Sequence, residues 1–228
     1  MNSWNMHFLI MGSLEVNNLI IVESENDKFF IERLIECSNV GSINVQCICE
    51  FECLEGMNNL NKKLEEIKFD KYNKVGIILD ADKEGIDKRI NFINNTLKNV
   101  CDDVNITEIN KLEKSSKLDV DFVCYIMHVN GYGELETVLK SIKKSDSFFA
   151  DCLESWRECL KNNGKDISDK EFDKLYINNY IRFDTCSKLE QKHASKYCGL
   201  KYAMKKDIWD LDSSILYDLK EFLKLLAS

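Results

Sequence analysis

Four short apolar segments, each followed by a segment with helical spacing, are the feature of this chain that most constrains its fold. The apolar segments are residues 17–24, 43–51, 74–82 and 120–129, and the helical ones are residues 27–37, 56–69, 84–100 and 133–143. The apolar side chains run on without the alternation of a half-exposed strand, which is typical of strands buried on both faces. Strands that alternate with helices form mostly parallel sheets. We therefore predict an α/β fold whose sheet is covered by helices on both faces.

The C-terminal third of the chain has a different pattern. Apolar residues recur there with helical spacing, in residues 147–163, 170–183 and 213–226, and no strand is indicated. No stretch with the composition of a linker separates this part from the rest. We predict an α/β domain at residues 1–144 and a helical C-terminal extension at residues 145–228 that packs on it.

The composition is that of an ordinary globular protein, with 44% hydrophobic and 31% charged residues in a chain of 228. The longest apolar runs are too short to span a bilayer, and the first residues lack the pattern of a secretory signal. We therefore expect a cytoplasmic protein without a membrane partner.

The ten cysteines are flanked by apolar residues and form no CxxC pair, which predicts free, largely buried thiols and neither disulfides nor structural zinc.

The formal net charge is −8 at pH 7, which argues against a broadly basic nucleic-acid-binding surface. An acidic protein can nevertheless bind phosphates if metal ions supply the local positive charge. Lysine clusters such as residues 140–144 can form local basic edges, although a solvated helix face is the simpler interpretation of each cluster.

Acidic residues stand where two of the predicted strands end. Glu23 ends the first strand, and Asp80 and Asp82 end the third. Alternate residues of an extended segment point the same way, so Asp80 and Asp82 can direct their carboxylates at one spot. Clustered carboxylates without nearby His or Cys favour Mg²⁺ or Mn²⁺. The alternative for Asp82 is that it is the N-cap of the helix that follows.

The segments IIVESENDKFF and GIILDADKEGIDKR resemble the two signatures of the Toprim domain, over roughly residues 18–140. Glu23 matches the first acid of that pattern, and Ser24 replaces its usual glycine. Asp27 matches the second acid, and the run from Asp80 to Gly85 matches the DxDxxG element.

The segment YIMHVNGYGELETVLKSI narrows the resemblance to small, stand-alone, OLD-like Toprim nucleases, in which a glycine precedes a Leu-Glu pair. Glu136 fits that acid, Glu134 is a further acid nearby, and residues 205–226 resemble the closing part of those proteins. The resemblance implies a doubly wound α/β catalytic domain, a site of acidic side chains, and cleavage or joining of phosphodiesters.

The resemblance also suggests roles for the acids. Asp80 and Asp82 would hold one metal ion with Glu23, while Asp27 and Glu136 would complete that site or hold a second ion. Glu23 acting as general base is an open alternative, as is a simple helix-start role for Asp27 and a solvated position for Glu136. A lysine that stabilises transition-state charge is expected, with these candidates: Lys196, Lys201 and Lys205.

A metal-dependent nuclease acting on DNA or RNA is the simplest function, because the chain lacks the further domains of a topoisomerase or primase. Such a nuclease would work alone or with an ATPase or another defence or repair protein. The alternatives are a nuclease that matures structured RNA and a non-catalytic module that binds metal or nucleotide for a partner.

Overall fold

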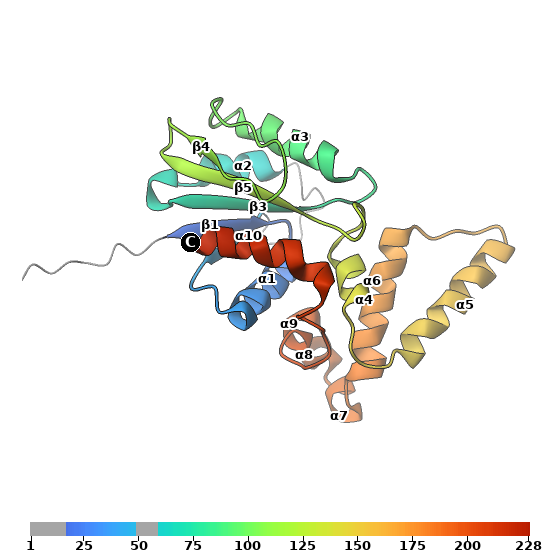
Figure 1. Ribbon diagram of the computed structural model, residues 1–228. Helices are drawn as coiled ribbons and strands as arrows, with labels where there is room; N and C mark the ends of the chain where they lie inside the picture. The colour runs from blue at the N-terminus through green and yellow to red at the C-terminus, as the bar shows by residue number, and fades with distance from the viewer. Residues whose placement is uncertain (1–16, 49–58) are drawn as a thin grey trace, which may run out of the picture.

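A five-stranded sheet forms the centre of the molecule in the computed structural model, which describes residues 17–48 and 59–228 (Figure 1). The strands are β1 (Asn18–Val22), β2 (Asn44–Cys47), β3 (Lys74–Asp80), β4 (Glu113–Ser115) and β5 (Val120–Met127). Their order is β2-β1-β3-β5-β4, and only β4 runs antiparallel to its neighbour. This confirms the predicted α/β class and the mostly parallel sheet.

Each of the four predicted strands contains an observed one, although residues 49–51 of the second prediction lie outside the described residues. The edge strand β4 was not predicted, because three mostly polar residues carry no periodic signal.

Helices cover both faces of the sheet, which explains the unbroken apolar runs. Helices α1 (Glu25–Ser38) and α10 (Tyr217–Ala227) lie on one face, and α2 (Leu60–Glu66) and α3 (Ile86–Leu97) lie on the other (Figure 1). Successive residues of β1 face opposite ways: Ile20 packs in the cluster with α1 and α10, while Ile21 packs with α2 and α3, and both are fully buried.

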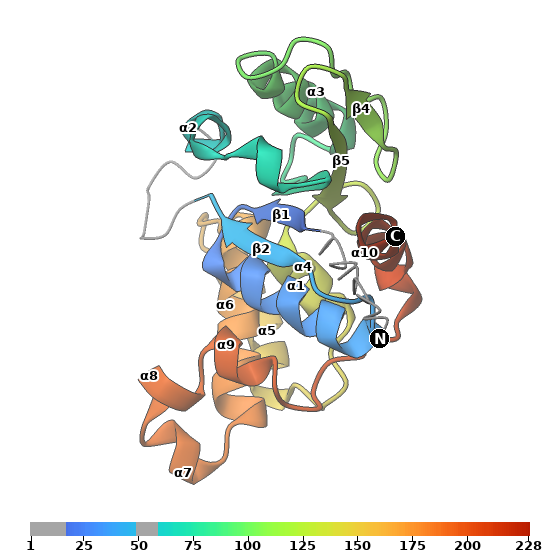
Figure 2. The same ribbon diagram turned by 90° about the vertical axis from the view of Figure 1, so that its left-hand side faces the viewer.

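Helices between residues 145 and 203 form the C-terminal part of the fold, as predicted (Figure 2). They are α5 (Phe148–Asn162), α6 (Asp169–Asn179), α7 (Lys188–Gln191), α8 (Ala194–Tyr197) and α9 (Leu200–Ala203), with a π-helical segment at Tyr180–Thr185 and a 3₁₀ turn at Ser214–Leu216. Helix α4 (Leu135–Ser141) and the 3₁₀ turn at Phe69–Lys71 lie within residues 1–144, the predicted α/β domain. None of the helices in the described ranges combines the length and the apolar character that crossing a bilayer requires.

Helix α10 returns from this extension to the sheet and completes its core. Phe222 and Leu226 are fully buried in the same cluster as Ile78 of β3. The Lys74 ammonium donates to the Leu225 carbonyl oxygen at 2.8 Å, which ties the start of β3 to the end of α10. The last helix of the chain is therefore part of a layer of the α/β core.

The close approach of α10 to β3 depends on Gly76. A Cβ atom there would lie 2.6 Å from Leu226 Cδ1 and 2.7 Å from Phe222 Cζ. We expect Gly76→Ala to lower the free energy of unfolding by about 1–3 kcal/mol, because the added methyl overpacks this contact. Urea denaturation measures the change. Gly199→Ala is the control, since a Cβ there meets nothing within 4 Å and the entropic effect on the unfolded chain is the same in both variants. Equal midpoints for the two variants would contradict the expected overpacking.

The prediction that the chain has no disulfide is wrong at one place. Cys186 and Cys198 are paired, with their Cα atoms 6.2 Å apart. The short helices α7 and α8 fold the chain back on itself between them, a reversal that the apolar flanks of the cysteines do not reveal. Elsewhere in the described part of the chain six cysteines are free, while Cys49 and Cys53 lie outside it.

Candidate functional site

The acids predicted at the strand ends emerge at one edge of the sheet. Val22 of β1 is the register partner of Ile78 of β3, so Glu23 and Asp80 both leave the sheet at its C-terminal edge. From β1 the chain crosses to β2 on one side, and β3 lies on the other side. The strand order therefore reverses between β1 and β3, which is where open α/β sheets bind their ligands.

Ser24 and Asp27 form the turn from β1 into α1. Ser24 is the N-cap, and its hydroxyl donates to Asp27 Oδ2 at 2.6 Å while its backbone N–H donates to the same oxygen at 2.9 Å. Asp27 therefore does have the helix-start role. It is also only 4% exposed, and burial, followed by the charge of Glu23, raises its pKa to about 6 against the lowering effect of Ser24.

Asp80 is the residue on which the acidic cluster centres. It is buried at the end of β3, and burial raises its pKa well above its usual value. Four neighbouring carboxylates raise it further: Asp27, Glu23, Glu134 and Glu136. The structure thus brings together four of the five predicted site residues and adds Glu134.

Glu134 and Glu136 reach this cluster from the start of α4. Glu134 is the N-cap residue and is 2% exposed, while Glu136 lies half-buried in the first turn. Burial raises the pKa of each carboxyl, and the nearby Lys170 and Lys174 act in the opposite direction. A solvated position on a helix face does not describe Glu136.

The Asp82 side chain does not point in the same direction as that of Asp80. Its φ of 49° is left-handed, so the alternation of an extended strand ends before it. Its carboxylate instead pairs with Arg89 at 2.5 Å and with Lys170 at 2.7 Å. Nor is Asp82 the N-cap of the next helix, because α3 begins at Ile86 with Gly85 in that position.

Two carboxylate oxygens beside Asp80 are buried without a hydrogen-bond partner in the described part of the chain: Glu23 Oε2 and Glu134 Oε1. A buried charged oxygen without a partner is costly and needs a cation or a donor. Within residues 17–48 and 59–228, however, no three His, Cys, Asp or Glu side chains are grouped so that they could hold a metal ion as they stand.

The cations at the site come from residues that the sequence did not single out. The Lys170 ammonium lies 3.0 Å from Glu134 Oε2 and bridges it to Asp82. Burial opposes the charge of Lys170, but the hydrogen bonds to Asp82 and Glu134 outweigh it and raise its pKa. No local pattern links residues 82 and 170, so only the fold reveals the pair.

The predicted lysine candidates have other neighbours. Lys201 lies over the ring of Phe29, with its ammonium 5.0 Å from the ring centroid. Lys196 lies in the same way over Tyr197, and Lys205 is exposed just after α9.

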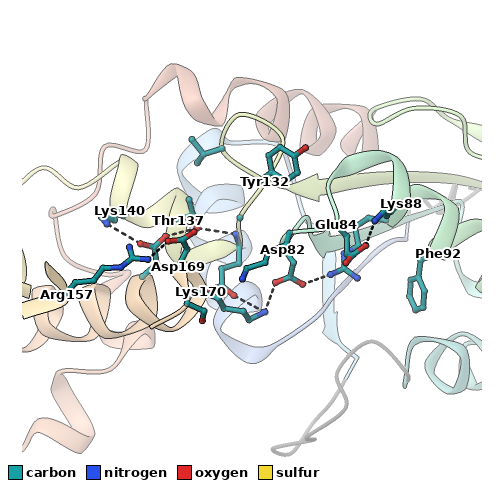
Figure 3. A pocket seen from close by; sticks show the side chains of 17 residues that line it. Asp82, Glu84, Lys88, Phe92, Tyr132, Thr137, Lys140, Arg157, Asp169 and Lys170 are labelled. Carbon is teal, nitrogen blue, oxygen red and sulfur yellow. Dashed lines mark hydrogen bonds and ion pairs between the residues drawn. The ribbon is translucent and has the colours of Figure 1, made fainter. Parts of the chain in front are cut away.

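A cavity of about 1250 Å³ opens beside the carboxylates, between the start of α3 and helices α4, α5 and α6 (Figure 3). Glu134 and Asp82 line it, so the cavity and the acidic cluster share a wall. Six basic side chains line it: Lys83, Lys88, Arg89, Lys140, Arg157 and Lys170. The cavity, whose lining has basic, acidic and apolar surface, lies next to the buried carboxylates, and its basic side chains suit an anionic substrate that reacts at a bound cation.

Comparison with known proteins identifies a family but no activity. No curated protein and no solved structure shows significant similarity to this chain. One family model matches residues 17–228, which is nearly the whole sequence. The chain therefore belongs to the family described as "Protein of unknown function (DUF3226)".

Proposed function

We propose that this protein is a divalent-metal-dependent nuclease of the Toprim type, which cleaves phosphodiester bonds of DNA or RNA. The observation that carries the proposal is the gathering of Glu23, Asp27, Asp80, Glu134 and Glu136 at the sheet edge where the strand order reverses. Four carboxylates that each raise the pKa of Asp80 are unfavourable beside it unless a cation lies among them.

The donor set fits Mg²⁺ or Mn²⁺. Every acid of the cluster offers hard carboxylate oxygens, and the orphaned Glu23 Oε2 and Glu134 Oε1 are available as ligands. Glu23, Asp80 and Glu136 would hold the ion, with Asp27 behind them or at a second ion. In the described part of the chain these side chains are not grouped closely enough to hold the ion as they stand, so binding would require side-chain rotations. When bound, such an ion activates a water molecule and offsets the charge of the phosphate.

The protein's own side chains would do the remaining work. Lys170 bridges Asp82 and Glu134 at the cavity wall, where its ammonium can stabilise the charge that develops on a phosphate in the transition state. Asp82 and Arg89 fix the position of that lysine, since Asp82 contacts both cations. Glu23, with one oxygen free of hydrogen bonds, can alternatively accept the proton of the attacking water.

A cleavage assay on the full chain tests the proposal. Purified protein is incubated with supercoiled plasmid, single-stranded DNA or a structured RNA, in Mg²⁺, in Mn²⁺ or in EDTA. We expect cleavage of at least one substrate with Mg²⁺ or Mn²⁺ and none in EDTA. Cleavage of structured RNA alone would support the maturation nuclease. Metal-independent cleavage, or none under any condition, would overturn the nuclease proposal.

A non-catalytic binding module is the second candidate. It is favoured by the ion pairs of Asp82 with Arg89 and Lys170. The charge of this carboxylate, a predicted metal ligand, is already neutralised by protein cations. In that case the protein would bind Mg²⁺ or Mn²⁺ and nucleic acid without cleaving it, and a partner such as an ATPase would supply the activity.

A further inference from the structure

Cationic side chains are spread along the cavity beside the acidic cluster. Figure 3 shows Lys140 and Arg157 at one end, Lys170 and Asp82 in the centre, and Lys88 at the other end. These residues come from the α3 side of the sheet and from α4, α5 and α6. Lys140 is paired with Asp173 and Glu154, and Lys170 with Asp82 and Glu134, so the cation at the other end, Lys88, is the one that a phosphate can reach most easily.

The charge of the cavity differs from that of the whole protein. Its lining carries six basic and five acidic side chains, whereas the chain has a net charge of −8. The ion pair at the outer end is weakly held, because the side chains of Lys88 and Glu84 are 71% and 51% exposed. Exposed pairs of this kind contribute little stability, so Lys88 can exchange Glu84 for a phosphate.

An exposed aromatic ring, Tyr132, lies above Asp82 in this view (Figure 3). Tyr132 is 60% exposed, and its ring lies close to Gly85, where an added Cβ would be 3.3 Å from Tyr132 Cε1. Lys88 is near enough that Tyr132 contributes to raising its pKa, after the larger effect of Glu84. Phe92 lines the cavity at the end where Lys88 lies (Figure 3). In proteins that bind single strands, an exposed aromatic ring stacks on a base and a nearby cation binds the phosphate of the backbone.

The size and chemistry of the cavity select among anionic ligands. Its volume of about 1250 Å³ is larger than most small-molecule sites. A duplex keeps its bases stacked inside, so an aromatic side chain can stack on a base only where the strand is unpaired. An acidic peptide would use the cations but would gain little from Tyr132 and Phe92.

We infer that this cavity binds one unpaired nucleic-acid strand, with Tyr132 stacked on a base, Lys88 holding a phosphate, and the acidic cluster beside the centre of the cavity. The inference rests on the proposed function and specifies its substrate as single-stranded DNA or RNA, or a frayed end.

Binding without cleavage tests the inference. Fluorescence anisotropy of labelled oligothymidylate or oligouridylate of about 12 nucleotides is measured in EDTA and compared with a duplex of the same length. We expect at least one of the two strands to bind about tenfold or more tightly than the duplex. Equal or tighter binding of the duplex would overturn the inference. So would equal displacement of the strand by polyglutamate or by a nucleoside triphosphate.

Matched variants assign the contacts. We expect Tyr132→Ala to weaken strand binding about tenfold and Tyr132→Phe to retain it, because stacking needs the ring and not the hydroxyl. Tyr217→Ala, at a tyrosine that is 63% exposed on α10, should leave binding unchanged.

Lys88→Gln should weaken binding and reduce its salt dependence by about one phosphate contact. Lys62→Gln is its control, because Lys62 is 76% exposed and has an i,i+4 glutamate like Lys88 but lies outside the cavity. Wild-type affinity in Tyr132→Ala and Lys88→Gln would sink the inference.

The two proposals fail separately. A strand that binds with these dependences in EDTA but is not cut in Mg²⁺ or Mn²⁺ would overturn the nuclease activity alone. Metal-dependent cleavage that is unchanged in Tyr132→Ala and Lys88→Gln would overturn the strand-binding inference alone.

Discussion

Asp80→Asn is expected to lower metal-dependent cleavage at least about a hundredfold. Substituting a residue that only hydrogen-bonds to a metal ligand already lowers activity by up to about a hundredfold, and Asp80 would be a ligand itself. It is also expected to leave the metal-free protein at least as stable as the wild type. Asp80 is buried among four carboxylates that raise its pKa, and a pair of like charges about 4 Å apart costs from about 1 kcal/mol in water to about 4 kcal/mol near a protein surface. Asparagine has the same shape and removes that repulsion, but it also removes a ligand charge. Cleavage rates and thermal melts in EDTA and in Mg²⁺ or Mn²⁺ measure both effects.

Asp82→Asn should behave differently, although the two aspartates are only two residues apart. Its carboxylate is the shared anion of Arg89, whose side chain is 7% exposed, and of Lys170. Removing that charge leaves two cations without their partner, so we expect a loss of about 1–3 kcal/mol in EDTA, less than for a fully buried pair.

Asp212→Asn is the control for both variants. Its side chain is 99% exposed and pairs only with Lys220 among the contacts of the described chain, so the effect on stability should be small. Wild-type cleavage in Asp80→Asn would rule out the metal-site proposal. The metal-site proposal would also be ruled out if neither metal raised the melting temperature of the wild type and Asp80→Asn melted at the same temperature as the wild type.

Asp27 is expected to destabilise the metal-free protein as the pH rises from about 4 to 7. In the folded protein burial, and then the charge of Glu23, raises the pKa of Asp27 to about 6 from 3.8. The folded state therefore binds this proton more tightly than the unfolded state does. The resulting stabilisation is complete below about pH 4 and is lost as the pH passes about 6, which amounts to about 3 kcal/mol. The raised pKa of Asp80 extends the loss in the same direction.

Urea denaturation in EDTA at several pH values, for the wild type and Asp27→Asn, measures this loss. Asparagine can still accept the hydrogen bonds of Ser24 but does not titrate, so the difference between the two proteins isolates Asp27. Between pH 4 and pH 7 we expect the wild type to lose more unfolding free energy than Asp27→Asn does. Mg²⁺ or Mn²⁺ should reduce the difference between the two proteins. Parallel stability curves in EDTA would contradict the buried position of the Asp27 carboxyl.

The sequence was sufficient to predict the layers of the fold. The unbroken apolar runs that became β1, β3 and β5 required burial on both sides, and the helical segments between them could supply it. It also predicted that Glu23 and Asp80 share an edge of the sheet, because parallel strands end on the same side. These predictions rest on local periodicity and on the direction of the strands, which the order of residues carries by itself.

The partners of the acids were decided by tertiary structure. The left-handed backbone at Asp82 turns its carboxylate away from Asp80, and the backbone pair with Gly133 that accompanies this turn joins residues far apart in the sequence. Lys170 reaches Asp82 and Glu134 only because α6 packs against α4, and Gly76 is needed only because α10 returns to β3. Contacts of this kind join distant parts of the chain, so they depend on packing that no local spacing encodes.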